Sequence, residues 1–423
     1  PLMTRPPLTT EPFKDLSVRE ASARVLPVLA GILAALIPFP KMTAVSETCF
    51  YGALLAVAWR ICRGVPFLFK SPLTVPFAVF VAWCSIGVWF SLDRANSVTD
   101  LYAHLIKYIV LYYLWVNLFD SEKGLGVLSR ILIASAGVFS VAAVVSFYVF
   151  SGHHLSDRLG EPAVLGITSD YIGFFALAAI LLSPGLFQGR MSVMGKAFLA
   201  VCVLCIFAAT VLTQSRATLI AALVSTLVLL GARRKAWIVS GLALFVIAIL
   251  FTPLGDRFSV EQFKRNERVG LYWTTLEVIK SYPWTGIGFG MQIYGNEKLL
   301  DLNRYNNRIP EPHRQQTPIR SPHSTFLDVT VRTGLIGLLF FLSILSTYIR
   351  MGWNVVRHAR SESIQTWGLC LFAVFLSILV QGMFSDGMFG PQAMSLYMNF
   401  AMMTILWRVH AGPKPGFDQQ ALR

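Results

Sequence analysis

The feature that most constrains this chain is a series of apolar blocks, each about 17 to 25 residues long, separated by short polar segments. Because the hydrocarbon core of a bilayer is about 30 Å thick, a helix needs roughly 20 apolar residues to cross it. The blocks therefore predict an all-α polytopic membrane protein. Strands of a transmembrane barrel would instead alternate apolar and polar residues. Composition agrees, because 55% of the residues are hydrophobic and only 14% are charged, against about 25% charged in a soluble domain.

The blocks predict about twelve membrane spans, with no internal repeat and no low-complexity segment among them. Their expected ranges are 24–41, 45–62, 74–92, 101–119, 126–150, 162–184, 196–213, 216–231, 236–252, 324–349, 365–385 and 392–408.

Basic residues divide the connections between the spans into two kinds. Segments at the ends of even-numbered spans are rich in arginine and lysine, whereas the alternate short connections hold few. Basic residues gather in cytoplasmic loops, so these ends and both termini are expected to be cytoplasmic. The net charge of +14 is explained in this way and does not indicate a nucleic-acid partner. The basic segments contain Arg60, Arg63 and Lys70; Arg190 and Lys196; Arg233, Arg234 and Lys235; and Arg350, Arg357 and Arg360.

The connection 253–323 falls on the opposite, outer face in this arrangement. It separates spans 1–9 (residues 1–252) from spans 10–12 and a short cytoplasmic tail (residues 324–423). Structureless loops of such length are uncommon, so the loop is expected to be partly helical and functional. The segment RVGLYWTTLEVIKSYPW predicts an amphipathic helix on or near the membrane surface. Its apolar residues are Val269, Tyr272, Trp273, Leu276, Val278 and Ile279.

Several arginines gather at this outer face. Arg216 begins the eighth span, where it either extends to the membrane interface or faces a wet cavity and holds an anion. Ser215 is a candidate helix cap, and free amides at that terminus would also favour an anion. Lys264, Arg265 and Arg268 precede the amphipathic helix. A mixed charge run is usually a solvated face, yet a guanidinium group also suits bidentate phosphate binding.

His323 lies where the outer loop meets the tenth span, directly after Pro322. A histidine at a membrane edge is often structural, but an imidazole ring is also a natural proton acceptor. Arg320 and Arg332 on either side are candidates for further anion contacts, although Arg332 is about two helical turns deeper.

The outer segments contain no DxD pair and no HExxH motif, and Cys202 and Cys205 have the character of small apolar residues within a span. We therefore expect neither a metal nor another cofactor. Several arginines with one base suit the transfer of a group from a lipid diphosphate. The arginines would neutralise the departing diphosphate in place of a divalent cation, and the histidine would deprotonate an acceptor hydroxyl.

Three segments resemble the O-antigen ligase family of bacterial envelopes: QSRATLIA, NERVGLYWTTLEVIKSYPWTGIGFG and SPHSTFLDVTVRTGLIGLL. The resemblance is best over residues 201–408. It implies a fold similar to that of the GT-C-type membrane glycosyltransferases. It also implies an inner-membrane enzyme that transfers O-antigen polysaccharide from undecaprenyl diphosphate to a sugar of the lipid A core. The reaction would occur on the periplasmic face, among membrane lipids, without metal or nucleotide.

Carried over residue by residue, the resemblance implies that Arg216 and Arg268 hold the donor diphosphate and that His323 is the general base of an inverting displacement. Asp386 matches an outer-face acid of the family, and a covalent route through such a carboxylate stays open. The sequence NERVG departs from the family pattern before the loop arginine, so Arg265 is a rival of Arg268. Lys264 and Arg320 are further candidates for diphosphate contact.

Three other functions stay open at this point. An O-antigen polymerase of the same superfamily would transfer glycan between two lipid diphosphates. A ligase for exported proteins would be expected to have a larger outer C-terminal region than the predicted inner tail HAGPKPGFDQQALR. A transporter of lipid-linked sugars would need polar or broken helices near mid-membrane and usually shows internal symmetry, which the sequence does not display. Asp170, within the sixth predicted span, is the polar residue that could line such a cavity.

Overall fold

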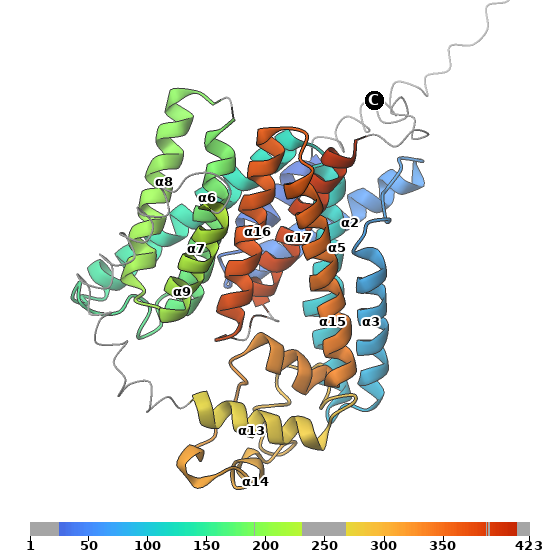
Figure 1. Cartoon of the computed structure of the whole chain (residues 1–423), viewed down its shortest axis with the longest axis vertical. Helices are drawn as coiled ribbons and strands as arrows, with labels where there is room; N and C mark the ends of the chain where they lie inside the picture. The colour runs from blue at the N-terminus through green and yellow to red at the C-terminus, as the bar shows by residue number, and fades with distance from the viewer. Residues whose placement is uncertain (1–24, 190, 231–267, 386, 388–389, 413–423) are drawn as a thin grey trace, which may run out of the picture.

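The computed structural model describes residues 25–189, 191–230, 268–385, 387 and 390–412. Within these residues the regular secondary structure is helical, apart from one isolated bridge between Val164 and Ile167. The helices form a bundle, and a small lobe lies across one end of it (Figure 1). The all-α prediction is thus confirmed.

The first described helix of the bundle is an apolar helix at Val25–Ala35. Its further α-helices are α2 (Thr43–Cys62), α3 (Thr74–Trp89), α4 (Arg94–Leu101), α5 (Lys107–Leu118), α6 (Glu122–Val144), α7 (Ser169–Phe187), α8 (Val193–Leu212), α9 (Arg216–Leu230), α15 (Thr325–Arg357), α16 (Glu362–Gly382) and α17 (Gly390–Ala411). Two π-helical segments, η1 (Tyr102–Ile106) and η2 (Val145–Phe150), follow α4 and α6, and the lobe contains α13 (Arg268–Ser281), α14 (Leu302–Asn306) and the 3₁₀ turn η3 (Glu311–His313).

Six of the described helices are long and apolar enough to cross a membrane: α2, α6 with η2, α7, α8, α15 and α16. Shorter apolar helices cover Val25–Ala35, Thr74–Trp89 and Arg216–Leu229. These helices support a multi-pass membrane protein without establishing the predicted number of spans. The ninth predicted span, 236–252, lies outside the described residues.

Apolar side chains on the outside of the bundle agree with a lipid environment. On α8, Phe198, Val201 and Leu204 are 57%, 59% and 67% exposed. Leu339 of α15 is 65% exposed. Water-soluble monomers rarely expose large contiguous apolar patches, so such faces are typical of contact with lipid or another apolar surface.

The sixth predicted span begins later than expected, because α7 starts at Ser169 and not near residue 162. The residues before it form a turn in which the Val164 and Ile167 backbones exchange hydrogen bonds of 3.0 and 2.9 Å. Leu165 and Gly166 have positive φ angles of 55° and 78°, which an α-helix cannot contain. Val164 and Ile167 are buried, so the apolar character of this segment reflects a packed turn.

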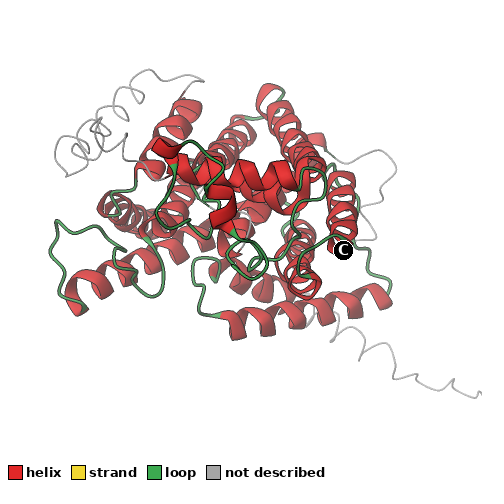
Figure 2. Cartoon of the chain, turned by 90° about the horizontal axis from the view of Figure 1, so that it is seen from below, coloured by secondary structure: helices red, strands yellow, loops and turns green. Residues whose placement is uncertain are grey.

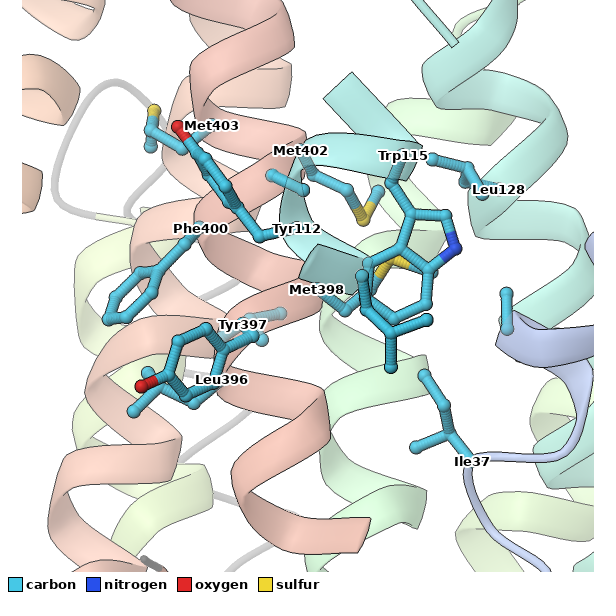
Figure 3. Packing of buried hydrophobic residues seen from close by; sticks show 14 of the residues in the cluster. Ile37, Tyr112, Trp115, Leu128, Leu396, Tyr397, Met398, Phe400, Met402 and Met403 are labelled. Carbon is cyan, nitrogen blue, oxygen red and sulfur yellow. The ribbon is translucent and has the colours of Figure 1, made fainter. Parts of the chain in front are cut away.

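Aromatic and methionine side chains fill the centre of the bundle. Tyr348 of α15 and Phe375 of α16 stack with their ring centroids 4.2 Å apart. Trp115 of α5 is fully buried and lies beside Met398 and Met402 of α17 (Figure 3). This packing fixes the relative positions of the helices whose ends carry the candidate site.

The lobe is attached to the bundle through a break in α15 at Gly334, whose φ is 72°. Backbone groups at the break pair with the lobe. The Ile287 amide donates to the Val331 carbonyl at 2.8 Å, and the Leu335 amide donates to the Pro283 carbonyl at 2.8 Å. The lobe and α15 are therefore joined by the main chain itself.

Helix α4 provides a second attachment through its polar side chains. The Asn96 Oδ1 atom accepts the Gln292 amide at 3.1 Å, and the Asp100 Oδ2 atom accepts the Met291 amide at 2.6 Å. The lobe segment 283–292 is therefore held between α15 on one side and α4 on the other.

The expected helix of the outer loop is present as α13, which lies across the end of the bundle (Figures 1 and 2). Its apolar residues divide between two faces. Val278 and Ile279 are buried in a small core inside the lobe. Val269, Trp273 and Leu276 are 40%, 40% and 39% exposed. Only the second group leaves an apolar stripe on the surface, so the helix serves as part of the lobe core as well.

Candidate functional site

The short segment that follows α16 is where the helices carrying the candidate residues meet. Helix α16 ends at Gly382 and α17 is described from Gly390. We call residues 383–385 and 387 the exit turn. Each of α9, α13 and α15 contacts the exit turn or the last turn of α16 near its own first residues, as the following contacts show.

Helix α15 reaches the exit turn through Thr325. The Thr325 hydroxyl donates to the Ser385 carbonyl at 3.2 Å and accepts the Gly387 amide at 2.9 Å. Glycine suits position 387 because a Cβ there would lie 2.7 Å from the Thr325 hydroxyl oxygen. The approach of α15 to this segment thus depends on one hydroxyl group.

His323, two residues before Thr325, is half-buried and has a φ of 46°. Residues other than glycine seldom adopt this left-handed conformation. Such strain persists only where the surrounding structure imposes it, and it clusters at functional positions. The backbone geometry therefore adds an observation to the sequence argument for His323.

Helix α13 reaches the exit turn through its first described turn. The Tyr272 hydroxyl donates to the Met383 carbonyl at 3.0 Å. The Arg268 guanidinium carbon lies 5.7 Å from the centre of the Phe384 ring, within the range of a cation–π contact. Arg268 is half-buried, so the lobe places an arginine at the end of the bundle.

Helix α9 meets the last turn of α16 at Gln381, two residues before the exit turn. The Thr218 hydroxyl donates to the Gln381 Oε1 atom at 3.1 Å in a buried contact. The Ser215 hydroxyl accepts the Thr218 amide at 3.3 Å, which confirms the predicted helix cap. Arg216 is half-buried in this first turn of α9.

A polar network that the sequence pattern did not reveal holds the start of α9. The Ser215 hydroxyl donates to the Asp170 Oδ1 atom at 2.6 Å. Arg158 donates to the same Asp170 oxygen at 3.2 Å and to the Thr213 carbonyl at 2.9 Å. The sequence showed Asp170 as a polar residue in an apolar span. Its contact with Ser215, the residue before Arg216, is seen only in the fold.

The arrangement is suited to binding an anion. The first turns of α9 and α15 carry the partial positive charge of their helix dipoles, and both helices start at this end of the bundle. Arg216 and Arg268 add two guanidinium groups on elements that approach the same segment. A planar guanidinium group can bind phosphate oxygens in a bidentate manner. With His323 at the start of α15, the same region can also accept a proton.

The remaining predicted site residues are placed elsewhere or lie outside the described part of the chain. Arg320 forms an ion pair of 2.5 Å with Glu297, and both side chains are about two-thirds exposed on the lobe. Lys264, Arg265 and Asp386 lie outside the described residues. The choice between Arg265 and Arg268 therefore stays open, and so does the placement of Asp386.

Arg332 is part of the lobe attachment and does not reach the surface. Its side chain is 6% exposed, and its Nε atom donates to the Asp328 carboxylate at 2.6 Å. The guanidinium group also donates to the Gly290 carbonyl. The pair fixes the loop that leads away from α13, so Arg332 supports the site from a distance.

A small, largely apolar cavity of about 40 Å³ lies between α6, α7, α16 and α17. Phe175, one helical turn beyond Asp170 on α7, and Val374, two turns before Gln381 on α16, both line it. The cavity therefore lies on the membrane side of the candidate site. In the part of the chain that the structure describes, no group of three or more His, Cys, Asp or Glu side chains could hold a metal ion.

Comparison with known proteins confirms the predicted resemblance. Residues 200–342 match the family model described as O-antigen ligase. Arg216, Arg268 and His323 all lie within this matched segment. The chain is also similar to a Rickettsia felis protein whose name proposes a polysaccharide ligase, with 24% identity over 335 residues that cover 73% of this chain and 74% of that protein. These findings support a glycosyl-transferring enzyme of the ligase or polymerase type.

Proposed function

We propose that this chain is an O-antigen ligase, which transfers O-antigen polysaccharide from undecaprenyl diphosphate to a sugar hydroxyl of the lipid A core. It would act in the bacterial inner membrane, with its site on the periplasmic face and both termini in the cytoplasm. Nothing in the proposal requires a nucleotide, because the lipid diphosphate is itself an activated donor.

The observation that carries the proposal is the convergence of three helix starts on one segment. Thr218 of α9 contacts Gln381, Tyr272 of α13 contacts Met383, and Thr325 of α15 contacts Ser385. Arg216, Arg268 and His323 lie within one helical turn of these contact residues. This convergence supports the proposal, because the three candidate residues come from distant parts of the chain.

In the proposed reaction the acceptor oxygen attacks the anomeric carbon of the donor. A bond forms between these two atoms while the bond from the anomeric carbon to the diphosphate oxygen breaks. His323 takes the proton of the acceptor hydroxyl. Undecaprenyl diphosphate departs, and Arg216 and Arg268 stabilise the negative charge that builds on its oxygen atoms. One displacement of this kind inverts the anomeric configuration.

A reconstituted assay tests this function. The purified chain would be placed in proteoliposomes with undecaprenyl-diphosphate-linked oligosaccharide and rough lipopolysaccharide. Wild type should form the capped product and release undecaprenyl diphosphate. His323→Gln should lower kcat by about 10²–10⁴-fold, and Arg216→Ala or Arg268→Ala by about 10²–10³-fold. Lys280→Gln is the matched control, because Lys280 is 65% exposed and paired with Glu277 on the lobe.

The outcomes separate the alternatives. Glycan growth on a second lipid diphosphate, without capping of lipopolysaccharide, would identify a polymerase. Movement of unchanged donor across the vesicle membrane would identify a transporter. Full activity of His323→Gln would remove the proposed base while leaving the ligase function intact.

A further inference from the structure

The outer lobe carries more basic than acidic residues, and its acids are already engaged. From Arg268 to His323, both included, the sequence has seven Lys and Arg residues and four Asp and Glu residues. Glu277 pairs with Lys280, Glu297 with Arg320 and Glu311 with Arg314, at 2.5, 2.5 and 3.7 Å.

The fourth acid, Asp301, caps α14. Its Oδ1 atom accepts the amides of Asn303 and Arg304 at 3.0 and 3.3 Å. Lys298, Arg304 and Arg308 are exposed, and among the described residues none has a carboxylate within ion-pair distance. Three positive charges around α14 are therefore not neutralised within the lobe.

The turn that bears these charges is rigid. Leu302, Tyr305 and Ile309 are 4%, 6% and 2% exposed and hold its inner side in place. Asn306 is buried, accepts the Gln315 amide at 3.0 Å and donates to the Gln315 carbonyl at 2.8 Å. A rigid turn loses little conformational entropy when a ligand binds to it.

Both arginines of this turn flank the aromatic side chains beneath them. The Arg308 guanidinium carbon lies 5.1 Å from the centre of the Tyr305 ring, a geometry that leaves the edge of a stacked guanidinium group available for hydrogen bonds. Burial, and then the neighbouring Tyr305, raise the pKa of Tyr282, and Arg304 is close enough to oppose that rise. Arg304 and Arg308 thus border one small area of the surface.

Two exposed amides complete the outer side of the turn. Asn303 and Asn307 are exposed and alternate with Arg304 and Arg308 along the chain. An amide side chain both donates and accepts hydrogen bonds, as sugar hydroxyls require. Guanidinium groups beside amides are suited to a saccharide that carries phosphate. We call Lys298, Asn303, Arg304, Asn307 and Arg308 the α14 face.

The position of the α14 face favours a glycan over a lipid headgroup. Helix α14 lies on the side of α13 away from the bundle (Figure 1). A glycan chain that extends outward from its lipid anchor can reach this distance, whereas the phosphate of a lipid headgroup stays at the membrane surface.

We propose that the α14 face binds a phosphorylated sugar of the acceptor oligosaccharide. This inference rests on the proposed function and names a second contact for its acceptor, away from the reacting hydroxyl. The contact would raise the affinity for the acceptor but leave kcat unchanged. The reason is that the contact contributes equally to binding of the ground state and of the transition state.

The test uses the full-length chain in proteoliposomes with two acceptors. One is rough lipopolysaccharide as isolated, and the other is the same material after alkaline phosphatase treatment. Arg304→Gln/Arg308→Gln should raise the KM for the untreated acceptor about tenfold and leave kcat within about twofold, since exposed ion pairs contribute little individually. The treated acceptor should show a raised KM with wild type and no further rise with the variant. Lys280→Gln is the control for loss of one charge.

Several results would overturn the inference. The double variant could leave the KM for the untreated acceptor unchanged, or raise the KM equally for both acceptors. It could also raise the KM for the donor and not that for the acceptor. A variant that loses affinity for anionic vesicles without acceptor would show that the face binds the membrane surface. Wild type that transfers saccharide to neither acceptor would instead contradict the proposed function, so the two failures are distinguishable.

Discussion

At the residue scale, Thr325 has the most consequential contacts near the candidate site. Its hydroxyl group donates a hydrogen bond to the Ser385 carbonyl and accepts one from the Gly387 amide. These two hydrogen bonds join the start of α15 to the exit turn. His323 lies two residues earlier in the chain, so its position relative to α16 depends on this contact.

Thr325→Val tests that dependence. Valine keeps the shape of threonine but leaves a partly buried carbonyl and amide without this partner, at a cost of about 1–3 kcal/mol for each group. We expect a lower unfolding temperature in detergent and a lower transfer rate. Thr325→Ser keeps the hydroxyl group and should retain both properties. Equal activity of Thr325→Val and wild type would show that the exit turn is positioned by other contacts.

Asp170 shows what residue patterns alone could not predict about the site. Arg216, Arg268 and His323 were predicted because each stands out as a polar residue at the end of an apolar or amphipathic segment. Asp170 stood out too, but its hydrogen bond to Ser215 joins residues 45 positions apart. Such a contact follows from helix packing, on which a single sequence carries no direct information.

At the element scale, the break in α15 determines where the lobe lies. The segment 324–349 was predicted as one continuous span, because apolar residues recur both before and after Gly334. A single glycine inside an apolar helix usually lowers the helix propensity modestly without ending the helix. Here the φ of 72° instead opens the helix, and the Ile287 and Leu335 amides use the break to join lobe and bundle.

Gly334→Ala should loosen this attachment. A Cβ at position 334 would overlap the Trp284 carbonyl oxygen, and a left-handed conformation costs an alanine about 1–2 kcal/mol. We expect faster trypsin cleavage at Arg304 and Arg308 with little change in helical content by circular dichroism. Gly52→Ala is the control, because a Cβ there would make an ordinary contact of 3.7 Å with Leu29. A lobe that resists trypsin in Gly334→Ala would contradict this account.

The boundaries of α7 and the two faces of α13 illustrate a second limit of sequence patterns. Apolar residues at 162–168 predicted an extension of the sixth span, yet they pack in a turn before Ser169. In α13, Val278 and Ile279 face the lobe core, while Trp273 remains partly exposed. Apolar character indicates burial or lipid contact, but it does not indicate against which partner a side chain is buried.

At the scale of the whole molecule, the bundle and the lobe divide the proposed work. The bundle supplies Arg216 and the start of α15, and the lobe supplies Arg268 beside Phe384 of the exit turn. Attachment of the lobe at both α15 and α4 keeps these two contributions together. A lobe joined at one point only could rotate, and a misplacement of about 1 Å can cost a large factor in rate.

The charge of the lobe raises a question about its side of the membrane. The lobe is basic, and basic loops usually stay in the cytoplasm. That rule applies to short loops, however, because long segments cross the membrane largely regardless of their charge. The orientation is therefore determined by short basic segments such as the one containing Arg60 and Arg63 after α2. The proposed periplasmic site depends on this argument.

Thiol labelling tests the orientation directly. Gln316→Cys places a thiol on an exposed part of the lobe, and native Cys62 is an exposed thiol at the end of α2. In intact spheroplasts, a membrane-impermeant maleimide should modify Gln316→Cys, and Cys62 should react only after the membrane is permeabilised. The wild-type chain gives the background from its own cysteines. The reverse pattern would place the lobe in the cytoplasm, where it could not meet a periplasmic acceptor, and would contradict the proposed function at its first requirement.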